Sequence, residues 1–358
     1  MADDVAGDRD VVVIGCGQSA LAIGYYLRRT SLAYAILDDA RTPGGAWRHT
    51  WASLRLFSPA QWSSLPGRLM AGGTSYYPTR DEAVAYLADY ESRYELPVVR
   101  PVRVARVERA GERLRVITDA GAWSARAVVS ATGTWSTPNV PCLTDRHRFG
   151  GRIVHSAQYE SPTEFCGQRV VVVGGGNSGA QIVADLAASA TVTWATRRPP
   201  TFLPDEIDGR YLFGEATARY RALTDGVAPP PPRLLGDIVM VEPVRRAREL
   251  GALNAVPMFT SFTDDGVVWP DGRRTAEEAV ILATGFRPAL DHLAPLDVMA
   301  PNGRIEVRGT RSVCEPCLWV VGYGEWTGYA SATLIGVGRT ARAAVEEIAR
   351  ALAAGRTV

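Results

Sequence analysis

Cysteine and histidine are both scarce in this chain of 358 residues. The five cysteines are too few for the disulfide framework of a small secreted domain. The four histidines are scattered along the chain and show no spacing that is typical of metal ligands. We therefore expect reduced thiols and no metal.

The sequence also lacks an excess of charge and any long apolar run. A formal net charge of +1 at pH 7 argues against broad attraction to nucleic acids or membranes. No apolar stretch approaches the length of a membrane span, and the first four residues, Met-Ala-Asp-Asp, do not resemble a secretory signal. We expect a cytoplasmic protein of ordinary globular composition, long enough for two domains.

A glycine loop follows the first strand-like run. Residues 10–14, Asp-Val-Val-Val-Ile, predict a buried parallel strand, and residues 15–20, Gly-Cys-Gly-Gln-Ser-Ala, lead into a helix expected over residues 19–29. The amides of such a loop and the helix N-terminus can hold a pyrophosphate. The next strand, residues 34–37, ends in Asp38, whose carboxylate can accept hydrogen bonds from ribose hydroxyls.

A second glycine loop, residues 174–179 (Gly-Gly-Gly-Asn-Ser-Gly), follows the strand-like residues 169–173. Two dinucleotide sites in one chain suggest electron transfer between them. From Gly15 to Asp38 is 23 positions (38 − 15), and from Gly174 to Arg197 is also 23 (197 − 174). The two halves therefore place an acid and a base at equivalent strand ends.

Arg197 and Arg198 stand at the second of these strand ends. They could pair with a 2′-phosphate through charge-assisted hydrogen bonds, which would select NADPH. Alternatively, the two arginines, which precede two prolines, form only a solvated turn. The matching register favours the phosphate site.

The symmetry extends to two Ala-Thr-Gly segments, residues 131–133 and 283–285. Each closes a nucleotide-binding half, and residues 98–129 before the first read as an antiparallel meander. We predict an α/β fold with two Rossmann-like dinucleotide-binding domains, in which one domain (167–285) is inserted into the other (1–166 and 286–358).

The pattern F-x-G-x-x-x-H-x-x-x-Y, formed by Phe149, Gly151, His155 and Tyr159, precedes the second strand-like run and its glycine loop. With the loops, it resembles the class B flavin-dependent monooxygenases, which include flavin-containing monooxygenases, N-hydroxylating enzymes and auxin-forming monooxygenases. The resemblance covers nearly the whole chain. Three segments are similar to short bacterial members such as the flavoproteins of arsenic-resistance operons: residues 44–48 (Gly-Gly-Ala-Trp-Arg), 53–59 (Ser-Leu-Arg-Leu-Phe-Ser-Pro) and 322–328 (Gly-Tyr-Gly-Glu-Trp-Thr-Gly).

This resemblance implies FAD in the outer domain and NADPH in the inserted domain. The implied FAD contacts are Gly15, Gly17, Asp38, Gly45 and Trp47, with Val104 near the adenine and Thr132 and Gly133 near the domain crossing. The implied NADPH contacts are Gly174, Gly176, Asn177, Ser178, Arg197 and Arg198. Further expected cofactor-binding residues are Gln18, Ser19, Arg48, Ala131, Thr284, Gly285 and Glu325. No side chain is assigned to catalysis.

The implied reaction is hydride transfer from NADPH to FAD, capture of O2 as a C4a-(hydro)peroxyflavin, and transfer of one oxygen atom to a small-molecule substrate. Many family members carry an Asn within the stretch that matches Ser58 and Pro59, and this chain has none there. That departure weakens an assignment to amine N-oxidation and leaves keto acid, thiol, sulfide and metalloid substrates open. A homodimer is possible.

Three other functions remain open. Cys314 and Cys317 form a C-x-x-C pair that could serve an NADPH-dependent disulfide or thiol reductase. The pair precedes a strand of the flavin half, however, whereas such pairs in thioredoxin-reductase relatives lie in the NADPH half. The chain could also be an NADPH oxidase or a flavin-bound sensor. His155 is expected to stabilise the linker or the NADP site, and the prolines at 229–232 predict a stiff loop that could cover the active-site cleft.

Overall fold

The computed structural model describes residues 5–205, 207, 211, 213–214, 218, 222, 227 and 237–354. The chain divides into two compact units. The first unit comprises Met1–Arg48, Pro59–Thr137 and Arg287–Val358, and the second comprises His49–Ser58 and Pro138–Phe286. The proline run expected to form a stiff loop lies outside the described residues.

The second unit differs from the expected inserted domain in two places. Residues His49–Ser58, expected in the outer domain, belong to it. Its main segment was expected to begin at residue 167 but begins at Pro138. The reason is strand β7 (Arg152–His155), which pairs in parallel with β14 (Ala279–Leu282) along its whole length and so completes the second sheet. The return to the first unit, expected after residue 285, occurs after Phe286.

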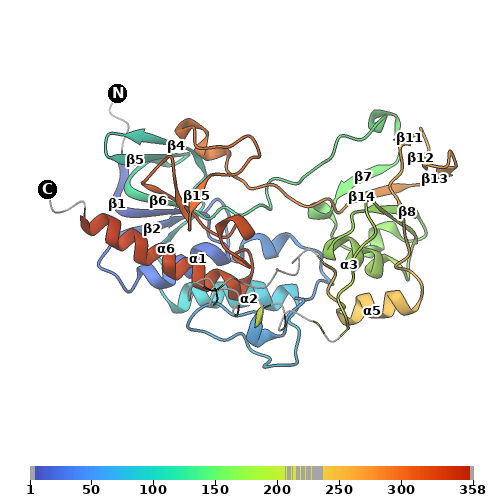
Figure 1. Cartoon of the computed structure of the whole chain (residues 1–358), viewed down its shortest axis with the longest axis horizontal. Helices are drawn as coiled ribbons and strands as arrows, with labels where there is room; N and C mark the ends of the chain where they lie inside the picture. Colours follow the sequence, from blue (N-terminus) through green and yellow to red (C-terminus); the bar gives the residue numbers. More distant parts are fainter. Residues whose placement is uncertain are drawn as a thin grey trace. The chain divides into compact units, whose positions relative to one another are not determined.

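A nine-stranded sheet forms the centre of the first unit (Figure 1). Its order is β15-β16-β17-β6-β1-β2-β3, and the hairpin β4-β5 joins it through β6, which confirms the predicted meander. The strands β17, β6, β1, β2 and β3 run parallel, so their carboxyl ends lie at one edge of the sheet. The strand bounds are β1 (Val5–Ile14), β2 (Tyr34–Leu37), β3 (Val98–Val99), β4 (Val104–Ala110), β5 (Arg113–Thr118), β6 (Gly121–Ser130), β15 (Val307–Arg308), β16 (Arg311–Ser312) and β17 (Leu318–Val320).

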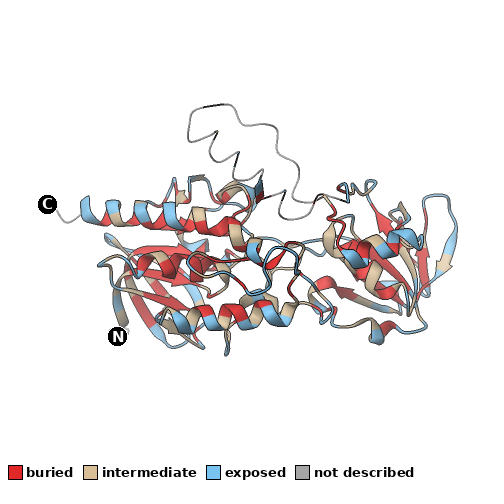
Figure 2. Cartoon of the chain, turned by 90° about the horizontal axis from the view of Figure 1, so that it is seen from below, coloured by how far each residue is buried: buried red, intermediate tan, exposed pale blue. Residues whose placement is uncertain are grey.

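Three long helices belong to this unit: α1 (Gln18–Leu27), α2 (Arg80–Arg93) and α6 (Leu334–Ala354). Helix α6 packs against α1, and its apolar residues, including Val345, Ile348 and Leu352, are buried. Figure 2 shows this division of α6 into a buried side and an exposed side. Helix α2 begins with a capping box formed by Thr79 and Glu82.

Three tyrosines at the end of α2 fix a neighbouring loop. Tyr86, Tyr90 and Tyr94 recur every four residues, so their side chains lie on one face of the helix. Their hydroxyls donate to the carbonyl oxygens of residues 68, 66 and 67 at 2.8, 2.7 and 2.8 Å respectively. The short segment 66–68 is therefore held in place by side chains from outside the loop.

The second unit is built on a five-stranded parallel sheet in the order β10-β9-β8-β14-β7, with a three-stranded antiparallel sheet beside it. The β8-α3-β9 segment is the strand-helix-strand unit expected around the second glycine loop. The parallel sheets of both units confirm the predicted α/β fold with two Rossmann-like domains. The other described strands and α-helices of this unit are β8 (Arg169–Val173), α3 (Asn177–Leu186), β9 (Thr191–Thr196), α5 (Glu242–Glu249), β10 (Ala255–Pro257), β11 (Ser261–Phe262), β12 (Gly266–Val268) and β13 (Arg274–Ala276).

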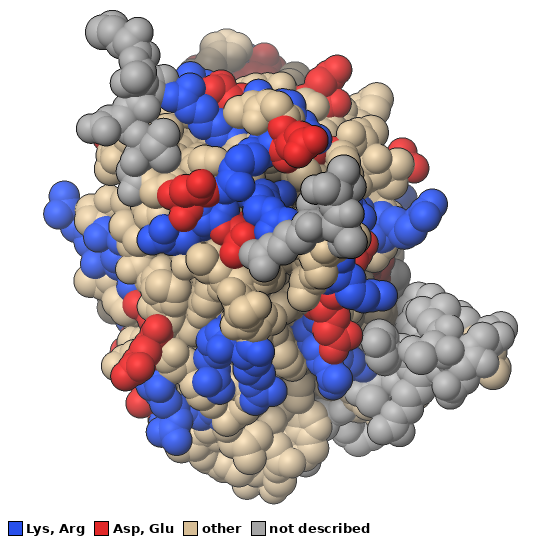
Figure 3. Space-filling view, turned by 90° about the vertical axis from the view of Figure 1, so that its left-hand side faces the viewer, with Lys and Arg blue, Asp and Glu red and all other residues tan. Residues whose placement is uncertain are grey.

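Charged side chains are intermixed on the face of the molecule drawn in Figure 3, where arginines alternate with aspartates and glutamates. This surface agrees with the small net charge of +1. No described helix combines the length and the apolar character that crossing a membrane requires. Nor do three or more histidine, cysteine, aspartate or glutamate side chains of the described residues come together as candidate metal ligands.

Candidate cofactor sites

The loop between β1 and α1 has the geometry that a pyrophosphate needs. Gly15 has a φ of +92°, and a Cβ there would lie 2.8 Å from the carbonyl oxygen of Ala131, so glycine is required. Gly17 is the N-cap of α1, and a Cβ on it would meet none of the described atoms within 4 Å. This open space beside the amides of a helix N-terminus is where an anion can approach the backbone.

Two other loops contact the same end of α1. Gly45 comes so close that a Cβ on it would lie 2.8 Å from the Cα of Gly17. The Nε1–H of Trp47 donates to Oε1 of Gln18 at 3.0 Å, and Nε2 of Gln18 donates to the carbonyl oxygen of Ala332 at 2.6 Å. The predicted residues Gly17, Gln18, Gly45 and Trp47 therefore lie together.

Ser19 and Gly322 make a further contact at this helix end. Ser19 is buried, and a Cβ on Gly322 would overlap its Oγ. Gly322 opens the loop that carries Glu325, whose side chain is exposed at the start of a short 3-10 turn. The Arg48 side chain makes a hydrogen bond within its own loop, where Nη1 donates to the carbonyl oxygen of Thr42 at 3.0 Å.

Asp38 follows β2 as expected, but its carboxylate is covered. The residue is 6% exposed, and Nε of Arg100 donates to Oδ2 of Asp38 at 3.1 Å. Burial raises the pKa of the Asp38 carboxyl, and the Arg100 guanidinium opposes that rise. Arg100 also pairs with Glu91, with Nη1 2.5 Å from Oε1. A ribose at this strand end would therefore share the Asp38 carboxylate with Arg100. Sequence reasoning did not identify Arg100 as part of this site.

The segment beyond Arg100 brings Val104 to the same region. The N–H of Val102 donates to the carbonyl oxygen of Asp38 at 2.8 Å, and Val104 begins β4 two residues later. Val104 is half-buried against the apolar core of the first unit. Its contact with an adenine stays a prediction, which this placement supports.

A buried hydrogen-bond network holds the Ala-Thr-Gly segment at residues 131–133. The hydroxyl oxygen of Tyr323 lies 2.7 Å from Oγ1 of Thr132 and 2.8 Å from Oγ of Ser130. Nε2 of His292 lies 3.1 Å from Oγ of Ser130. Ser130, His292 and Tyr323 were missed by sequence reasoning because the fold alone joins them; Ser130 and His292 are 162 positions apart.

We expect His292 to make the stability of the protein depend on pH. Burial lowers its pKa from 6.5 to about 4, so the folded protein keeps the imidazole neutral while the unfolded chain binds a proton below about pH 6.5. The free energy of unfolding should fall as pH drops from about 6.5 toward 4, by about 2 kcal/mol between pH 7.5 and pH 5. Urea titrations of wild type and His292→Gln at both pH values test this. An equal fall in the two proteins would contradict it.

The loop between β8 and α3 repeats the first loop's contacts. Gly174 has a φ of +137°, and a Cβ on it would overlap the carbonyl oxygen of Ala283, which begins the second Ala-Thr-Gly segment. Gly15 makes the same approach to Ala131 in the first unit. Gly176 is the N-cap of α3, the role that its counterpart has on α1. The internal repeat seen in the sequence is therefore also a repeat of tertiary contacts.

A cavity of about 420 Å³ lies beside this second loop. Both Arg197 and Arg198 line it, and both are exposed. Among the described residues that line it, these two positive charges accompany one carboxylate, that of Asp237, so the cavity suits an anion. Gly175 of the glycine loop lines the same cavity, so the two arginines lie beside the loop expected to hold the second nucleotide. The other lining residues are Pro199, Pro200 and Thr201.

Two residues predicted to hold the second nucleotide make hydrogen bonds to protein backbone. Nδ2 of Asn177 donates to the carbonyl oxygen of Asp237 at 3.0 Å, and Oδ1 of Asn177 accepts the N–H of Val239 at 2.9 Å. Oγ1 of Thr284 donates to the carbonyl oxygen of Asn139 at 2.6 Å, and Nδ2 of Asn139 returns a bond at 3.1 Å. Asn177 and Thr284 thus brace the site, while Ser178 is half-buried in the first turn of α3.

His155 fixes the end of the second Ala-Thr-Gly segment. The N–H of Ala157 donates to Nδ1 of His155 at 3.1 Å, so Nε2 carries the proton and donates to the carbonyl oxygen of Gly285 at 3.0 Å. Burial lowers the pKa of His155, which favours this neutral form. The geometry supports the expected stabilising role.

Tyr159, the last residue of the same motif, anchors another segment. Its hydroxyl donates to Oδ2 of Asp185 at 2.7 Å, and Oγ of Ser53 donates to Oδ1 of Asp185 at 2.8 Å. Trp51 packs on the Tyr159 ring, with the ring centroids 6.1 Å apart. These contacts explain why residues 49–58 belong to the second unit.

Cys314 and Cys317 lie away from the first glycine loop. Both are free thiols, and the carbonyl oxygen of Cys317 accepts the N–H of Val128 on β6. Gly15 adjoins Ala131, which follows Val128 by three residues along the chain. At roughly 3.3 Å per residue, the backbone of Cys317 is therefore about 10 Å from the contact between Gly15 and Ala131. Nucleotides bind at the carboxyl ends of parallel strands, so this placement does not favour a flavin-linked disulfide reductase.

Comparisons with known proteins agree with this geometry. A profile of the pyridine nucleotide-disulphide oxidoreductase family matches residues 12–206. A CzcO-like oxidoreductase from Geobacillus kaustophilus is 31% identical over 346 residues, which cover 95% of this chain and 98% of that protein. An indole-3-pyruvate monooxygenase from Oryza sativa subsp. japonica is 29% identical over 335 residues, covering 80% and 76% of the two proteins.

A solved structure is similar over nearly the full length. It is that of a flavin-containing monooxygenase from Stenotrophomonas maltophilia, which is 50% identical, covers 97% of this chain and 99% of its own, and superposes with a TM-score of 0.88. The chain therefore belongs to the pyridine nucleotide-disulphide oxidoreductase family and, within it, to the class B flavin-dependent monooxygenases, which use FAD and NADPH.

Proposed function

We propose that the protein transfers one oxygen atom from O2 to a small-molecule substrate, with FAD bound to the first unit and NADPH to the second. The observation that carries this assignment is the pair of matching glycine loops. Each loop presses its first glycine against an Ala-Thr-Gly carbonyl, but the strand ends that follow carry Asp38 in one unit and two arginines in the other. The acid suits an unphosphorylated ribose, and the arginines suit a 2′-phosphate.

The residues around the first loop fit FAD. Gly17 offers an open approach to the N-terminus of α1, and Gly45 and Trp47 lie beside it. The backbone at Gly45 can approach a flat ring system closely, and the Trp47 ring can pack on one. The hydrogen bonds of Ser130 and Tyr323 fix the segment 131–133, which is expected near the domain crossing. These contacts preorganise a site for a large dinucleotide.

FAD bound at the first loop would supply the redox chemistry of the proposed reaction, namely hydride acceptance and reaction with O2. The residues of the chain would bind the two nucleotides and orient them. The two helix N-termini would hold the pyrophosphates, and Arg197 and Arg198 would hold the 2′-phosphate. Asn177, His155 and Thr284 keep the walls of the second site in place through backbone contacts. No nucleophilic side chain is needed.

For the substrate we propose that keto acids be tested first, followed by sulfides. The rice relative is named an indole-3-pyruvate monooxygenase, and this chain lacks the Asn that would favour amine oxidation. Thiols and metalloids complete the screen.

The test is stopped-flow absorbance of the FAD-loaded protein, reduced with NADPH and then mixed with oxygenated buffer without substrate. A long-lived spectrum that differs from oxidised and reduced flavin and depends on NADP⁺ is the expected result. Direct return to oxidised flavin with stoichiometric peroxide would instead indicate an NADPH oxidase. No reduction by NADPH would indicate a sensor.

The double variant Cys314→Ser, Cys317→Ser addresses the reductase alternative. We expect it to oxidise NADPH and oxygenate substrate within about twofold of wild type, because the pair lies about 10 Å from the glycine loop along the sheet. Steady-state NADPH consumption and product formation provide the measurement. A loss of turnover greater than about tenfold with retained FAD would support the reductase instead.

A further inference from the structure

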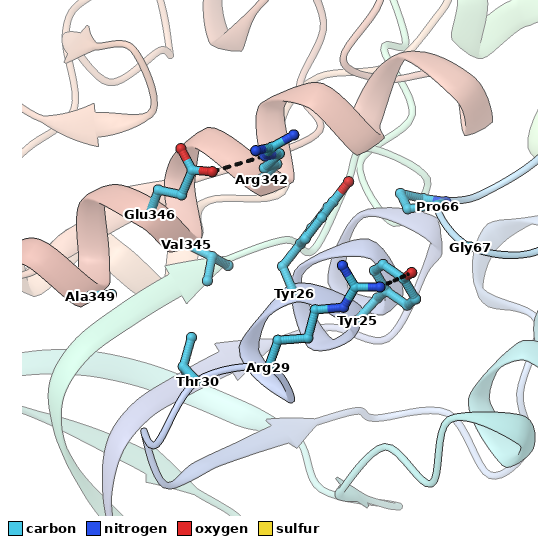
Figure 4. Close-up of a pocket in the computed structure, with 10 residues that line it drawn as sticks. All are labelled: Tyr25, Tyr26, Arg29, Thr30, Pro66, Gly67, Arg342, Val345, Glu346 and Ala349. Atoms are coloured by element: carbon cyan, nitrogen blue, oxygen red, sulfur yellow. Dashed lines mark hydrogen bonds and ion pairs between the residues drawn. The ribbon is translucent and has the colours of Figure 1, made fainter.

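A second cavity lies in the first unit, between α1 and α6 (Figure 4). Its volume is about 570 Å³, within the range of roughly 300–1,000 Å³ that small-molecule sites occupy. The lining residues are Tyr25, Tyr26, Arg29, Thr30, Pro66, Gly67, Arg342, Val345, Glu346 and Ala349. Tyr26 stands eight residues beyond Gln18, or about 12 Å along α1, so the cavity is separate from the glycine loop.

The cavity wall at Pro66 and Gly67 is held firmly. Hydroxyls of the α2 tyrosines bond both carbonyl oxygens, as described above. Gly67 has a φ of +82°, and a Cβ on it would overlap the Tyr25 hydroxyl. A Cβ on Gly338 of α6 would lie 2.8 Å from Cγ of Pro66. These close approaches need glycine at two places, so the cavity is preformed.

The charges around the cavity favour an anion. Arg29 of α1 donates from Nη2 to the Tyr25 hydroxyl at 2.5 Å, and its guanidinium carbon lies 4.5 Å from the Tyr25 ring centroid. Tyr25 therefore orients this cation at one side of the cavity. On α6, Nε of Arg342 pairs with Oε1 of Glu346 at 2.8 Å. The lining carries two positive charges and one negative charge, which suits a single negative charge on a ligand.

The remaining surface favours an aromatic body on that ligand. Figure 4 shows the Tyr26 ring between Arg29 and Arg342, and Val345 and Ala349 line the α6 side. Burial raises the pKa of the Tyr26 hydroxyl, so it stays neutral and can donate a hydrogen bond. A ring can pack on Tyr26 and Val345 while its acid group lies near the guanidiniums.

We propose that this cavity binds an aromatic carboxylate at a site separate from both nucleotides. The carboxylate lies near the guanidiniums of Arg29 and Arg342, which flank the Tyr26 ring, and the ring of the ligand packs against Tyr26 and Val345. Because the cavity contains no part of either glycine loop, this proposal does not depend on the assigned reaction.

The test is isothermal titration calorimetry of the FAD-loaded protein with naphthoate, with saturating NADP⁺ present to fill the second nucleotide site. We expect saturable binding of one naphthoate per chain. The uncharged analogue naphthamide should bind at least about tenfold more weakly, because it cannot pair with the guanidiniums. Absence of naphthoate binding, or equal affinity for the two compounds, would overturn the proposal.

Variants locate the bound probe. Arg29→Gln and Arg342→Gln should each weaken naphthoate binding about three- to tenfold, since both side chains are exposed and their charges are partly screened. Ala349→Trp should block the cavity without changing its charge, and Arg308→Gln, an exposed arginine on β15, is the matched control. Unchanged affinity in Ala349→Trp, with the folded state verified by thermal melting, would place the probe elsewhere and overturn the proposal.

Discussion

Replacing Gly17 with alanine should strip FAD from the protein without destabilising the polypeptide. A Cβ at this position meets none of the described atoms within 4 Å, and Gly17 does not have the positive φ that would strain alanine. The methyl group would instead occupy the space through which a pyrophosphate approaches the amides of α1. Loss of two charge-assisted bonds at about 1.5–3 kcal/mol each corresponds to a roughly hundredfold or greater rise in the FAD dissociation constant.

Fluorescence titration of the apoprotein with FAD measures this change, and thermal unfolding of the apoprotein provides the stability. Two comparisons isolate the effect. The affinity of Gly17→Ala for NADP⁺ should stay at the wild-type value, since the second loop is untouched. Gly15→Ala, by contrast, should destabilise the apoprotein itself, because its φ of +92° and a contact of 2.8 Å with Ala131 leave no room for a methyl. Wild-type FAD affinity in Gly17→Ala would refute the assignment of the first loop.

The double variant Arg197→Ala, Arg198→Ala should discriminate against NADPH. Both guanidiniums line the cavity beside Gly175 and can pair with a 2′-phosphate, which NADH lacks. Loss of a charge-assisted contact worth about 1.5–3 kcal/mol predicts a roughly ten- to hundredfold higher KM for NADPH, with little change for NADH. Steady-state kinetics with each nucleotide provide the measurement.

The control for this experiment removes the same charge elsewhere in the second unit. Arg245→Ala, Arg246→Ala deletes two arginines from α5 that do not line the cavity, so it should leave the preference for NADPH intact. If the cavity variant raised both KM values equally, the arginines would only stabilise the loop. The solvated-turn interpretation would then be correct.

Two residues that the sequence predicted to bind cofactors also make contacts with distant parts of the chain. Asp38 was expected to face a ribose, but Arg100 covers its carboxylate. Asn177 was expected to hold NADPH, yet both ends of its amide bond to the backbone near Asp237. In each case the partner lies 60 or more positions away, so no local pattern could have indicated it.

The sequence by itself determined the two strand-loop-helix units and their equivalence. Glycine at residues 15 and 174 is a local requirement of positive φ, and the equal spacing to Asp38 and Arg197 follows from the regular length of a strand, a helix and a strand. Such short-range constraints can be recognised in a single amino-acid sequence.

The tertiary structure decided where the second unit begins, what surrounds the cofactor loops and where the second cavity lies. Strand β7 joins the second sheet because its hydrogen bonds are completed by β14, more than a hundred residues later. Ser130, His292 and Tyr323 form one buried network, and α1 and α6 enclose the cavity beside Tyr26, only after the sheet has brought distant segments together. Long-range pairing fixes these features, and it leaves no periodic signal in the sequence.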